Sequence, residues 1–229
     1  MQLLCFTYAG GKSDFYEKLQ ENLGCDIRVI ALDYPGHGKR RNEKLLNDID
    51  ELGKDMFEQL QSVCNFKEPY GIFGYSMGCI VSLCLYDIIC KNGLNLPQHI
   101  FLAAHFPHTN KLYLKFNDSA YEDELKNHIG KFGGIPEKLL NNSAFWRMYL
   151  PMYRDDFYAI GTYDFEKRKP VIDTSATIFY SESDTPYQDM KEWKRFLIAG
   201  TQYVRFEGNH FFMNEHCEEI SEIIRRKLL

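Results

Sequence analysis

The sequence predicts an α/β protein with a mainly parallel sheet and helices on both of its faces. Short β-rich runs alternate with helical patterns along the 229 residues, and this alternation favours a right-handed, doubly wound sheet. Several runs are apolar at consecutive positions, which is typical of strands covered on both faces. Hydrophobic residues make up 45% of the chain, enough for a sizeable core, and we expect one domain over residues 1–229.

Six runs are expected to form the strands, beginning with QLLCFTY near the N-terminus. They occupy residues 2–8, 26–34, 70–75, 99–104, 175–181 and 202–208. The first run is short and has no basic residue before Lys12, so it fails as a secretory leader and as a membrane span. We therefore interpret it as the first strand.

Three further stretches predict helices between or after these strands. Residues 49–63 carry apolar side chains at 3.6-residue spacing behind Asp48, a suitable N-cap. Residues 77–91 are apolar nearly all round and end before Gly93, so this helix should be the most buried. Residues 214–228 begin with glutamates and end with basic residues, an order that suits the helix dipole.

The segment from residue 108 to about 170 interrupts the alternation of strands and helices. It has no convincing β run, but it contains aromatic residues and amphipathic patterns. A stretch of about 60 residues is too long for a simple loop in a compact domain. We therefore expect a helical lid inserted between the fourth and fifth strands.

The stretch GYSMG places Ser76 between a predicted strand and the helix expected to be most buried. A sharp strand–helix turn of this type exposes a nucleophile. It needs small residues two positions before and after the serine, because the backbones approach closely there. Gly74 and Gly78 meet this need, so we predict Ser76 as a nucleophile. The alternative is an incidental serine in a strand–helix turn.

A serine hydroxyl needs a base to accept its proton. In this architecture an acid and then a base follow later in the chain, each after a strand. Asp184 follows the fifth expected strand and His210 the sixth, both at carboxyl ends where ligands bind. We predict Asp184 as the acid and His210 as the base. Glu182 and Asp173 remain alternatives for the acid, and His108 for the base.

Acyl transfer also needs N–H donors aimed at the developing oxyanion. The N–H of Met77, next to the nucleophile at the positive end of its helix, is the first candidate. The second should come from the loop TYAGG after the first strand, where we expect the N–H of Ala9, with Tyr8 as its neighbour. Alternatively, this Gly-Gly turn only leads into the next helix.

Charge, cysteine content and ligand spacing argue against several other classes of protein. The formal net charge of −5 gives no global positive field, so we expect neither nucleic acid nor a membrane as a partner. The seven cysteines form no CxxC pair, which indicates a reduced, cytoplasmic protein. His105-x-x-His108 lacks a third ligand and AGGK lacks the P-loop spacing, so we expect no metal and no cofactor.

With these residues located, the sequence resembles the type II (editing) thioesterases of nonribosomal peptide and polyketide synthesis, a branch of the α/β hydrolases. CFTYAGG is similar to the first strand and oxyanion loop of that family, YPGHGKR to its second-strand turn, GYSMG to its nucleophile turn and GNHFF to its histidine motif. GGIPEKLLNN and LPMYRDDF resemble its lid. The chain departs from the family at Thr7, where Pro is common, at His37, where Arg is frequent, and at Ser183-Asp184-Thr185.

The resemblance implies an α/β-hydrolase fold. It also implies hydrolysis of acyl or aminoacyl thioesters on the phosphopantetheine arm of carrier proteins, through an acyl-Ser76 intermediate. Such enzymes free a synthase from aberrant or stalled groups. The partner is then a carrier protein, the basic loop 38–41 is a candidate docking patch, and the enzyme is expected to be a monomer. Substrate contacts are expected from four residues: Tyr8, Tyr75, Trp146 and Met148.

Three other functions stay open at this point. A chain-terminating thioesterase that acts on fatty acyl-carrier proteins would share every catalytic residue and differ in the depth of its chamber. A general carboxylesterase would turn over activated oxygen esters regardless of a carrier. A silent module that only binds a synthase is less compatible with an intact set of Ser76, Asp184 and His210.

Overall fold

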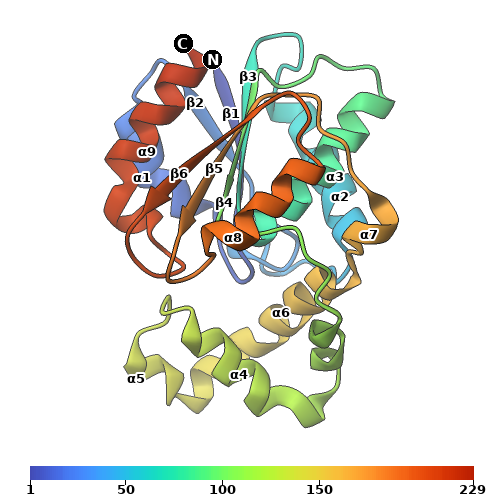
Figure 1. Cartoon of the computed structure of the whole chain (residues 1–229). Helices are drawn as coiled ribbons and strands as arrows, with labels where there is room; N and C mark the ends of the chain where they lie inside the picture. Colours follow the sequence, from blue (N-terminus) through green and yellow to red (C-terminus); the bar gives the residue numbers. More distant parts are fainter.

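The computed structural model describes all residues from 1 to 229 and is organised around one six-stranded sheet (Figure 1). The strands are β1 Gln2–Phe6, β2 Arg28–Ala31, β3 Tyr70–Tyr75, β4 His99–Ala103, β5 Ala176–Ser181 and β6 Thr201–Phe206. Their order is β2-β1-β3-β4-β5-β6, and every neighbouring pair is parallel. The predicted α/β fold is therefore confirmed, and every expected run overlaps one of these strands.

Helices cover the sheet on both faces. The four that do so are α1 Glu17–Leu23, α2 Ile49–Val63, α3 Met77–Lys91 and α9 Met213–Leu228. Helices α1 and α9 pack on one face, and α2 and α3 on the other (Figure 1). The side chains of β1 alternate accordingly: Leu3 and Cys5 belong to the core beneath α1 and α9, while Leu4 and Phe6 belong to the core beneath α2 and α3.

The three predicted helices form within one residue of their expected bounds. Asp48 caps α2, since its carboxylate accepts hydrogen bonds from the N–H groups of Asp50 and Glu51. Helix α3 buries 11 of its 15 residues, and Gly93 beyond its end has a φ of 63°. The sequence did not predict α1. Only two of its seven residues are buried, so its apolar periodicity is weak.

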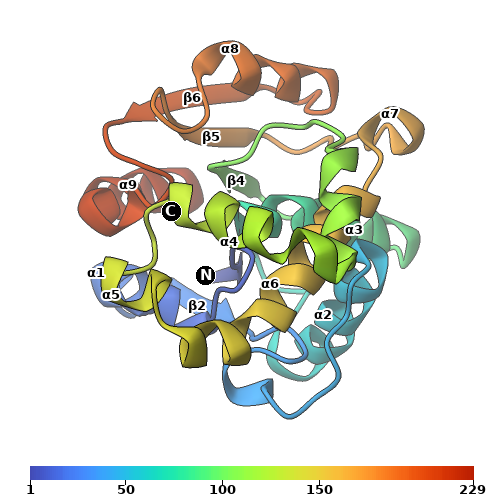
Figure 2. The ribbon, with the colours of Figure 1, turned by 90° about the horizontal axis from the view of Figure 1, so that it is seen from below.

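The segment between β4 and β5 is helical, and it lies across the carboxyl ends of the strands (Figures 1 and 2). Its elements are η3 Lys111–Asn117, η4 Ser119–Tyr121, α4 Glu122–Lys131, α5 Glu137–Leu140, α6 Ser143–Thr162 and α7 Phe165–Arg168. This is the segment in which the sequence predicts a lid. The remaining short elements are η1 Ser13–Tyr16, η2 Gly38–Arg40, α8 Tyr187–Met190 and η5 Lys191–Arg195. A helix with the length and apolar character needed to cross a membrane is absent.

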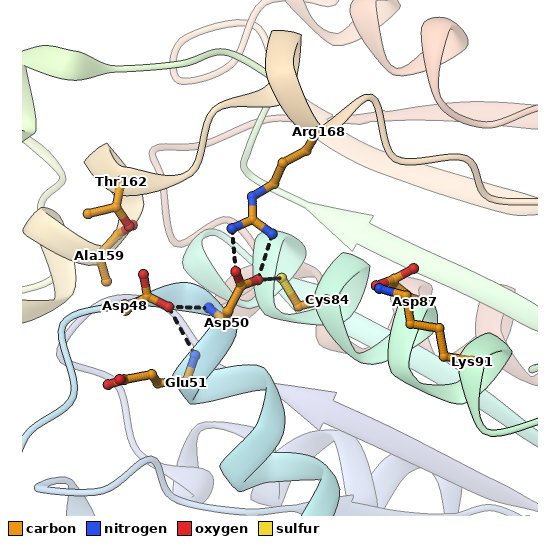
Figure 3. A network of polar contacts seen from close by, with 9 residues as sticks. All are labelled: Asp48, Asp50, Glu51, Cys84, Asp87, Lys91, Ala159, Thr162 and Arg168. Carbon is orange, nitrogen blue, oxygen red and sulfur yellow. Dashed lines mark hydrogen bonds and ion pairs between the residues drawn. The ribbon is translucent and has the colours of Figure 1, made fainter.

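An ion pair fastens the end of the lid to α2 and α3 (Figure 3). Arg168, the last residue of α7, donates two hydrogen bonds to the carboxylate of Asp50 in the first turn of α2, one of them at 2.7 Å. Cys84 of α3 contacts the same carboxylate at 3.4 Å. The guanidinium of Arg168 also lies 4.8 Å from the centre of the Tyr163 ring. The pair thus connects α7 to two helices that come much earlier in the chain.

Replacing Arg168 with methionine is expected to lower the free energy of unfolding by no more than about 1 kcal/mol. The side chains of Arg168 and Asp50 are 38% and 37% exposed, so solvent and salt screen the pair. Denaturant unfolding of the wild type and of Arg168→Met at low and high salt would measure this loss. It should shrink at high salt, and a large loss that persists there would contradict the expectation.

Candidate active site

Ser76 lies on a sharp turn between β3 and α3. Its φ of 53° and ψ of −117° are unfavourable for a residue with a side chain, and the Ala103 carbonyl accepts its N–H at 2.8 Å. A Cβ added to Gly74 would lie 2.5 Å from the carbonyl oxygen of Gly78. One added to Gly78 would lie only 2.0 Å from that of Phe6. The turn therefore needs both glycines, as a nucleophile turn does.

His210 and Asp184 are paired where β6 and β5 end. Nδ1 of His210 lies 2.9 Å from each carboxylate oxygen of Asp184, and the two side chains are only 8% and 11% exposed. Such a pair fixes the ring and its tautomer and leaves Nε2 free to accept a proton from Ser76. The structure contains no hydrogen bond between Nε2 and the Ser76 hydroxyl. Catalytic contacts of this kind often close only when the substrate binds.

The alternative acids, Glu182 and Asp173, and the alternative base, His108, do not form such a carboxylate–histidine pair. Glu182 is exposed, and Asp173 lies before β5, at the opposite end of the sheet. Nδ1 of His108 contacts the carbonyl of Phe106 at 3.0 Å rather than a carboxylate. The geometry therefore favours Asp184 and His210. No group of three or more His, Cys, Asp or Glu side chains is placed to hold a metal ion.

A cavity of about 160 Å³ lies between the sheet and the lid, and Ser76, Asp184 and His210 all line it. Apolar side chains of the lid form much of its wall: Ile129, Phe132, Ile135, Phe157 and Ile160. Its volume is close to that of a protein cavity of roughly 150 Å³ that holds one benzene molecule. This volume suits a short chain of a few carbon atoms.

Both predicted oxyanion donors lie close to the nucleophile. Met77 follows Ser76 in the chain, and Ala9 lines the same cavity as Ser76. The N–H of Met77 is the first of α3. Neither N–H donates to an acceptor in the protein, so both are available to a ligand. Gly10, with a φ of 77°, follows Ala9, and a Cβ there would lie 2.2 Å from the Tyr153 ring. The loop thus needs glycine to pass against the lid helix α6.

A buried pair that the sequence motifs did not reveal holds this loop in place. Asp156 of α6 accepts a hydrogen bond from the Gly10 N–H at 2.6 Å and contacts Nε2 of His37 at 2.9 Å. Neither side chain is more than 1% exposed. Burial alone lowers the pKa of His37, but the charge and the hydrogen bond of Asp156 outweigh it and raise this pKa above 6.5. The lid is thereby tied directly to the loop that carries Ala9.

Of the predicted substrate contacts on the sheet side, Tyr8 lines the cavity and Tyr75 does not. The prediction for Tyr75 is corrected. Its side chain is fully buried, and its hydroxyl donates a hydrogen bond to the carbonyl of His210 at 2.7 Å. The alternation of side chains in β3 turns Tyr75 into the core beneath α9, away from the exposed turn. Tyr75 therefore supports the histidine loop instead of the substrate.

The two predicted contacts in the lid are corrected as well. Nε1 of Trp146 donates to the carbonyl of Leu140 at 2.7 Å, so this ring packs within the lid, and Met148 is 72% exposed. The cavity-lining residues of α6 are Tyr153, Phe157 and Ile160. Only the C-terminal half of α6 faces the cavity, because its first turns extend along α5.

Known proteins resemble this chain along nearly its whole length. A family model described as "Thioesterase domain" matches residues 1–228. Gramicidin S biosynthesis protein GrsT from Aneurinibacillus migulanus is 25% identical over 234 residues, which cover 100% of this chain and 89% of GrsT. The medium-chain S-acyl fatty acid synthase thioesterase of Homo sapiens is 26% identical over 221 residues, with coverages of 95% and 83%. The structure of BorB, a type II thioesterase from the borrelidin biosynthetic cluster, matches with a TM-score of 0.85 and 27% identity, over 100% of this chain and 92% of BorB.

Proposed function

This chain belongs to the thioesterase family and hydrolyses thioesters, and from this premise we propose that its substrates are acyl or aminoacyl groups on the phosphopantetheine arm of carrier proteins. The enzyme removes aberrant or stalled groups from a nonribosomal peptide or polyketide synthase. The similarity to GrsT, named for gramicidin S biosynthesis, and to BorB, from the borrelidin cluster, supports this role. The enzyme needs no cofactor of its own, because the substrate brings the arm.

The proposed reaction uses three side chains and two backbone donors. His210 takes the proton of the Ser76 hydroxyl as its oxygen attacks the thioester carbonyl, and Asp184 holds the imidazole in the required tautomer. The N–H groups of Met77 and Ala9 stabilise the oxyanion of the tetrahedral intermediate. Its collapse expels the thiol of the arm and leaves an acyl-Ser76 ester, which water hydrolyses with His210 again acting as the base. Thiol pKa values lie near 8.5, so this group leaves without strong acid assistance.

The observation that carries the proposal is the small apolar cavity that opens beside Ser76 and the His210–Asp184 pair. Because apolar residues of the lid form part of its wall beside Ser76, a short acyl group can pack there while its thioester carbon reaches the Ser76 oxygen. The size of the cavity supports the removal of short groups.

Chain termination in fatty acid synthesis is a second candidate, because one relative is a medium-chain enzyme of that system. Such a role needs a chamber that holds a medium-length chain. The cavity of about 160 Å³ is similar in volume to one of roughly 150 Å³ that holds a single benzene molecule, and this favours the editing role over chain termination.

The proposal makes a carrier protein the partner of a monomeric, cytoplasmic enzyme. Carrier proteins are commonly acidic, so docking should use local positive charge in spite of the net charge of −5. The loop 38–41 is the candidate patch, although its Arg40 is already paired with Asp55 and a second carboxylate. Lys39 and Arg41 are exposed and therefore available.

The proposed substrate can be tested by comparing kcat/KM for three acetyl donors: an acetyl-phosphopantetheinyl carrier protein, acetyl-coenzyme A and p-nitrophenyl acetate. We expect the carrier-bound thioester to be the best substrate by about tenfold or more, since docking contributes binding energy only there. Ser76→Ala serves as the control for contaminating esterases.

Two results would overturn the proposal. Equal or faster turnover of the two free esters would indicate a general hydrolase. A panel of carrier-bound acyl groups that showed a strong preference for medium or long chains would indicate chain termination instead.

A further inference from the structure

Two loops at the carboxyl edge of the sheet carry the paired acid and base. The acid loop, residues 182–186, follows β5, and the histidine loop, residues 207–211, follows β6. The last pair of the ladder between these strands is Ser181 and Phe206. No backbone–backbone hydrogen bond joins the two loops beyond that pair. Side chains must therefore fix how the loops lie relative to each other.

Two serine hydroxyls connect the end of β5 and the acid loop to the histidine loop. Oγ of Ser181 and Oγ of Ser183 each donate a hydrogen bond to the carbonyl of Gly208, both at 2.5 Å. A carbonyl oxygen has two lone pairs and can accept both bonds. Ser181 is only 1% exposed, whereas Ser183 is exposed, so water competes mainly for the bond from Ser183.

These two bonds are special because the loops share so few others. Apart from the contact between Asp184 and His210, they are the only hydrogen bonds between residues 181–186 and residues 207–211. The accepting residue is a glycine with a φ of 114°, a backbone conformation that residues with a side chain rarely adopt. The connection therefore joins the backbone two residues before the base to the residue that directly precedes the acid.

The imidazole of His210 depends on this arrangement for its orientation. Its ring forms hydrogen bonds only with Asp184, and none with Ser76. The direction in which Nε2 points is thus set by the position of Asp184 relative to the histidine loop. A misplacement of about 1 Å between reacting groups can cost about a hundredfold in rate. Any contact that keeps the two loops in register therefore bears on catalysis.

We propose that Ser181 and Ser183 are positioning residues, which hold the acid loop against the histidine loop so that Asp184 keeps the His210 imidazole aligned with Ser76. Neither serine lines the cavity, so both act through the Asp184–His210 pair and not on the substrate. The inference rests on the proposed function, in which His210 is the base in both steps. Because the two hydroxyls share one acceptor, each partly compensates for loss of the other.

The first test measures kcat and KM for acetyl-pantetheine in variants that lack one or both hydroxyls. Ser181→Ala should lower kcat by about tenfold and Ser181→Ala/Ser183→Ala by about a hundredfold, with KM nearly unchanged, because the orientation of the base matters in the transition state. Ser183→Ala alone should stay within a few-fold of the wild type. Ser181→Thr keeps the hydroxyl and should keep most of the activity.

Ser221→Ala is the matched control. Ser221 is also 1% exposed, and its hydroxyl donates to a backbone carbonyl, that of Cys217, at 2.6 Å within α9. This variant loses the same type of buried hydrogen bond away from the two loops, so kcat should not change. Thermal unfolding of every variant shows whether it is folded under the assay conditions.

The second test asks whether the serines act through the pair. Residues that act as a unit have non-additive effects. Once Asp184→Asn has removed the acid, adding Ser181→Ala should change the rate by no more than about twofold. Single-turnover hydrolysis with enzyme in excess measures these slow rates. The rate of labelling of Ser76 by a serine-reactive phosphonate, which also needs His210, should show the same dependence.

The outcomes separate this inference from the proposed function. Wild-type kcat in the folded double variant, together with an inactive Ser76→Ala, would overturn the positioning role alone. An equal loss from Ser181→Ala with and without Asp184 would also overturn it, since the serines would then support the structure independently of the pair. Absence of Ser76-dependent hydrolysis of any thioester would overturn the proposed function and this inference with it.

Discussion

Replacing Ser76 with alanine should lower kcat/KM for thioester hydrolysis by about 10⁴-fold or more. The oxygen of Ser76 forms the acyl-enzyme, and His210 cannot substitute for it. A residual rate above that in water should remain, because the N–H groups of Met77 and Ala9 and the cavity are unchanged. Turnover of an acyl-pantetheine thioester with a thiol reagent measures the loss, and a serine-reactive phosphonate should label the wild type but not the variant.

Ser82→Ala offers a matched control on the same helix. Ser82 is buried, and its hydroxyl donates to the Gly78 carbonyl at 2.7 Å, so this variant removes a serine hydroxyl from α3 without touching the cavity. Its kcat should stay within a few-fold of the wild type. If Ser76→Ala retained a tenth of the wild-type activity, Ser76 would not be the nucleophile.

Of the substitutions considered, Asp156→Ala should lower the free energy of unfolding most, by about 3–5 kcal/mol. The change leaves His37 buried without its counter-charge and the Gly10 N–H without an acceptor. Activity should fall as well, since the loop that presents the Ala9 N–H loses its attachment to α6. Denaturant unfolding and single-turnover hydrolysis measure the two effects. Asp155→Ala removes the neighbouring, half-buried carboxylate and should destabilise far less.

The Asp156–His37 pair also predicts how stability depends on pH. The folded protein raises the pKa of His37, so the stability that the charged pair contributes is complete below about pH 6.5 and is lost as pH rises through the raised value. The difference in unfolding free energy between the wild type and Asp156→Asn should therefore be largest in mild acid and shrink in alkali. Asp33 also raises the pKa of His37 and persists in the variant. A difference that grew with pH would contradict a charged His37.

Local sequence patterns predicted most of the fold and the positions of Ser76, Asp184 and His210 within it. Strands are short and continuous, so their apolar runs are visible in the chain, and GYSMG fixes the turn at Ser76 within a few residues. Asp184 and His210 could be placed because the parallel sheet brings the carboxyl ends of β5 and β6 together. Each of these predictions needed only the order of the elements.

The lining of the cavity could not be predicted in the same way. Which part of α6 faces the cavity depends on how this helix crosses the sheet. The sequence shows large apolar side chains all along this stretch, and we selected Trp146 and Met148, whereas Phe157 and Ile160 line the cavity. Asp156 has its partners in loops that precede it by more than a hundred residues. One signal was nonetheless present in the sequence. Asp156 is a carboxylate at helical spacing among residues of α6 that are otherwise apolar and buried.

When lids are exchanged between relatives to change the acyl groups that such an enzyme hydrolyses, the residues at positions 37 and 156 must be compatible with each other. A chimaera that imports α4 and α5 alone keeps this chain's own Asp156 beneath the oxyanion loop. A graft that includes α6 brings a foreign residue to position 156, where it must match His37 in charge and length. The residues at positions 37 and 156 should therefore be exchanged together. A fragment boundary within residues 141–142, just before α6, separates the helices that can be exchanged freely from the helix that contacts the oxyanion loop.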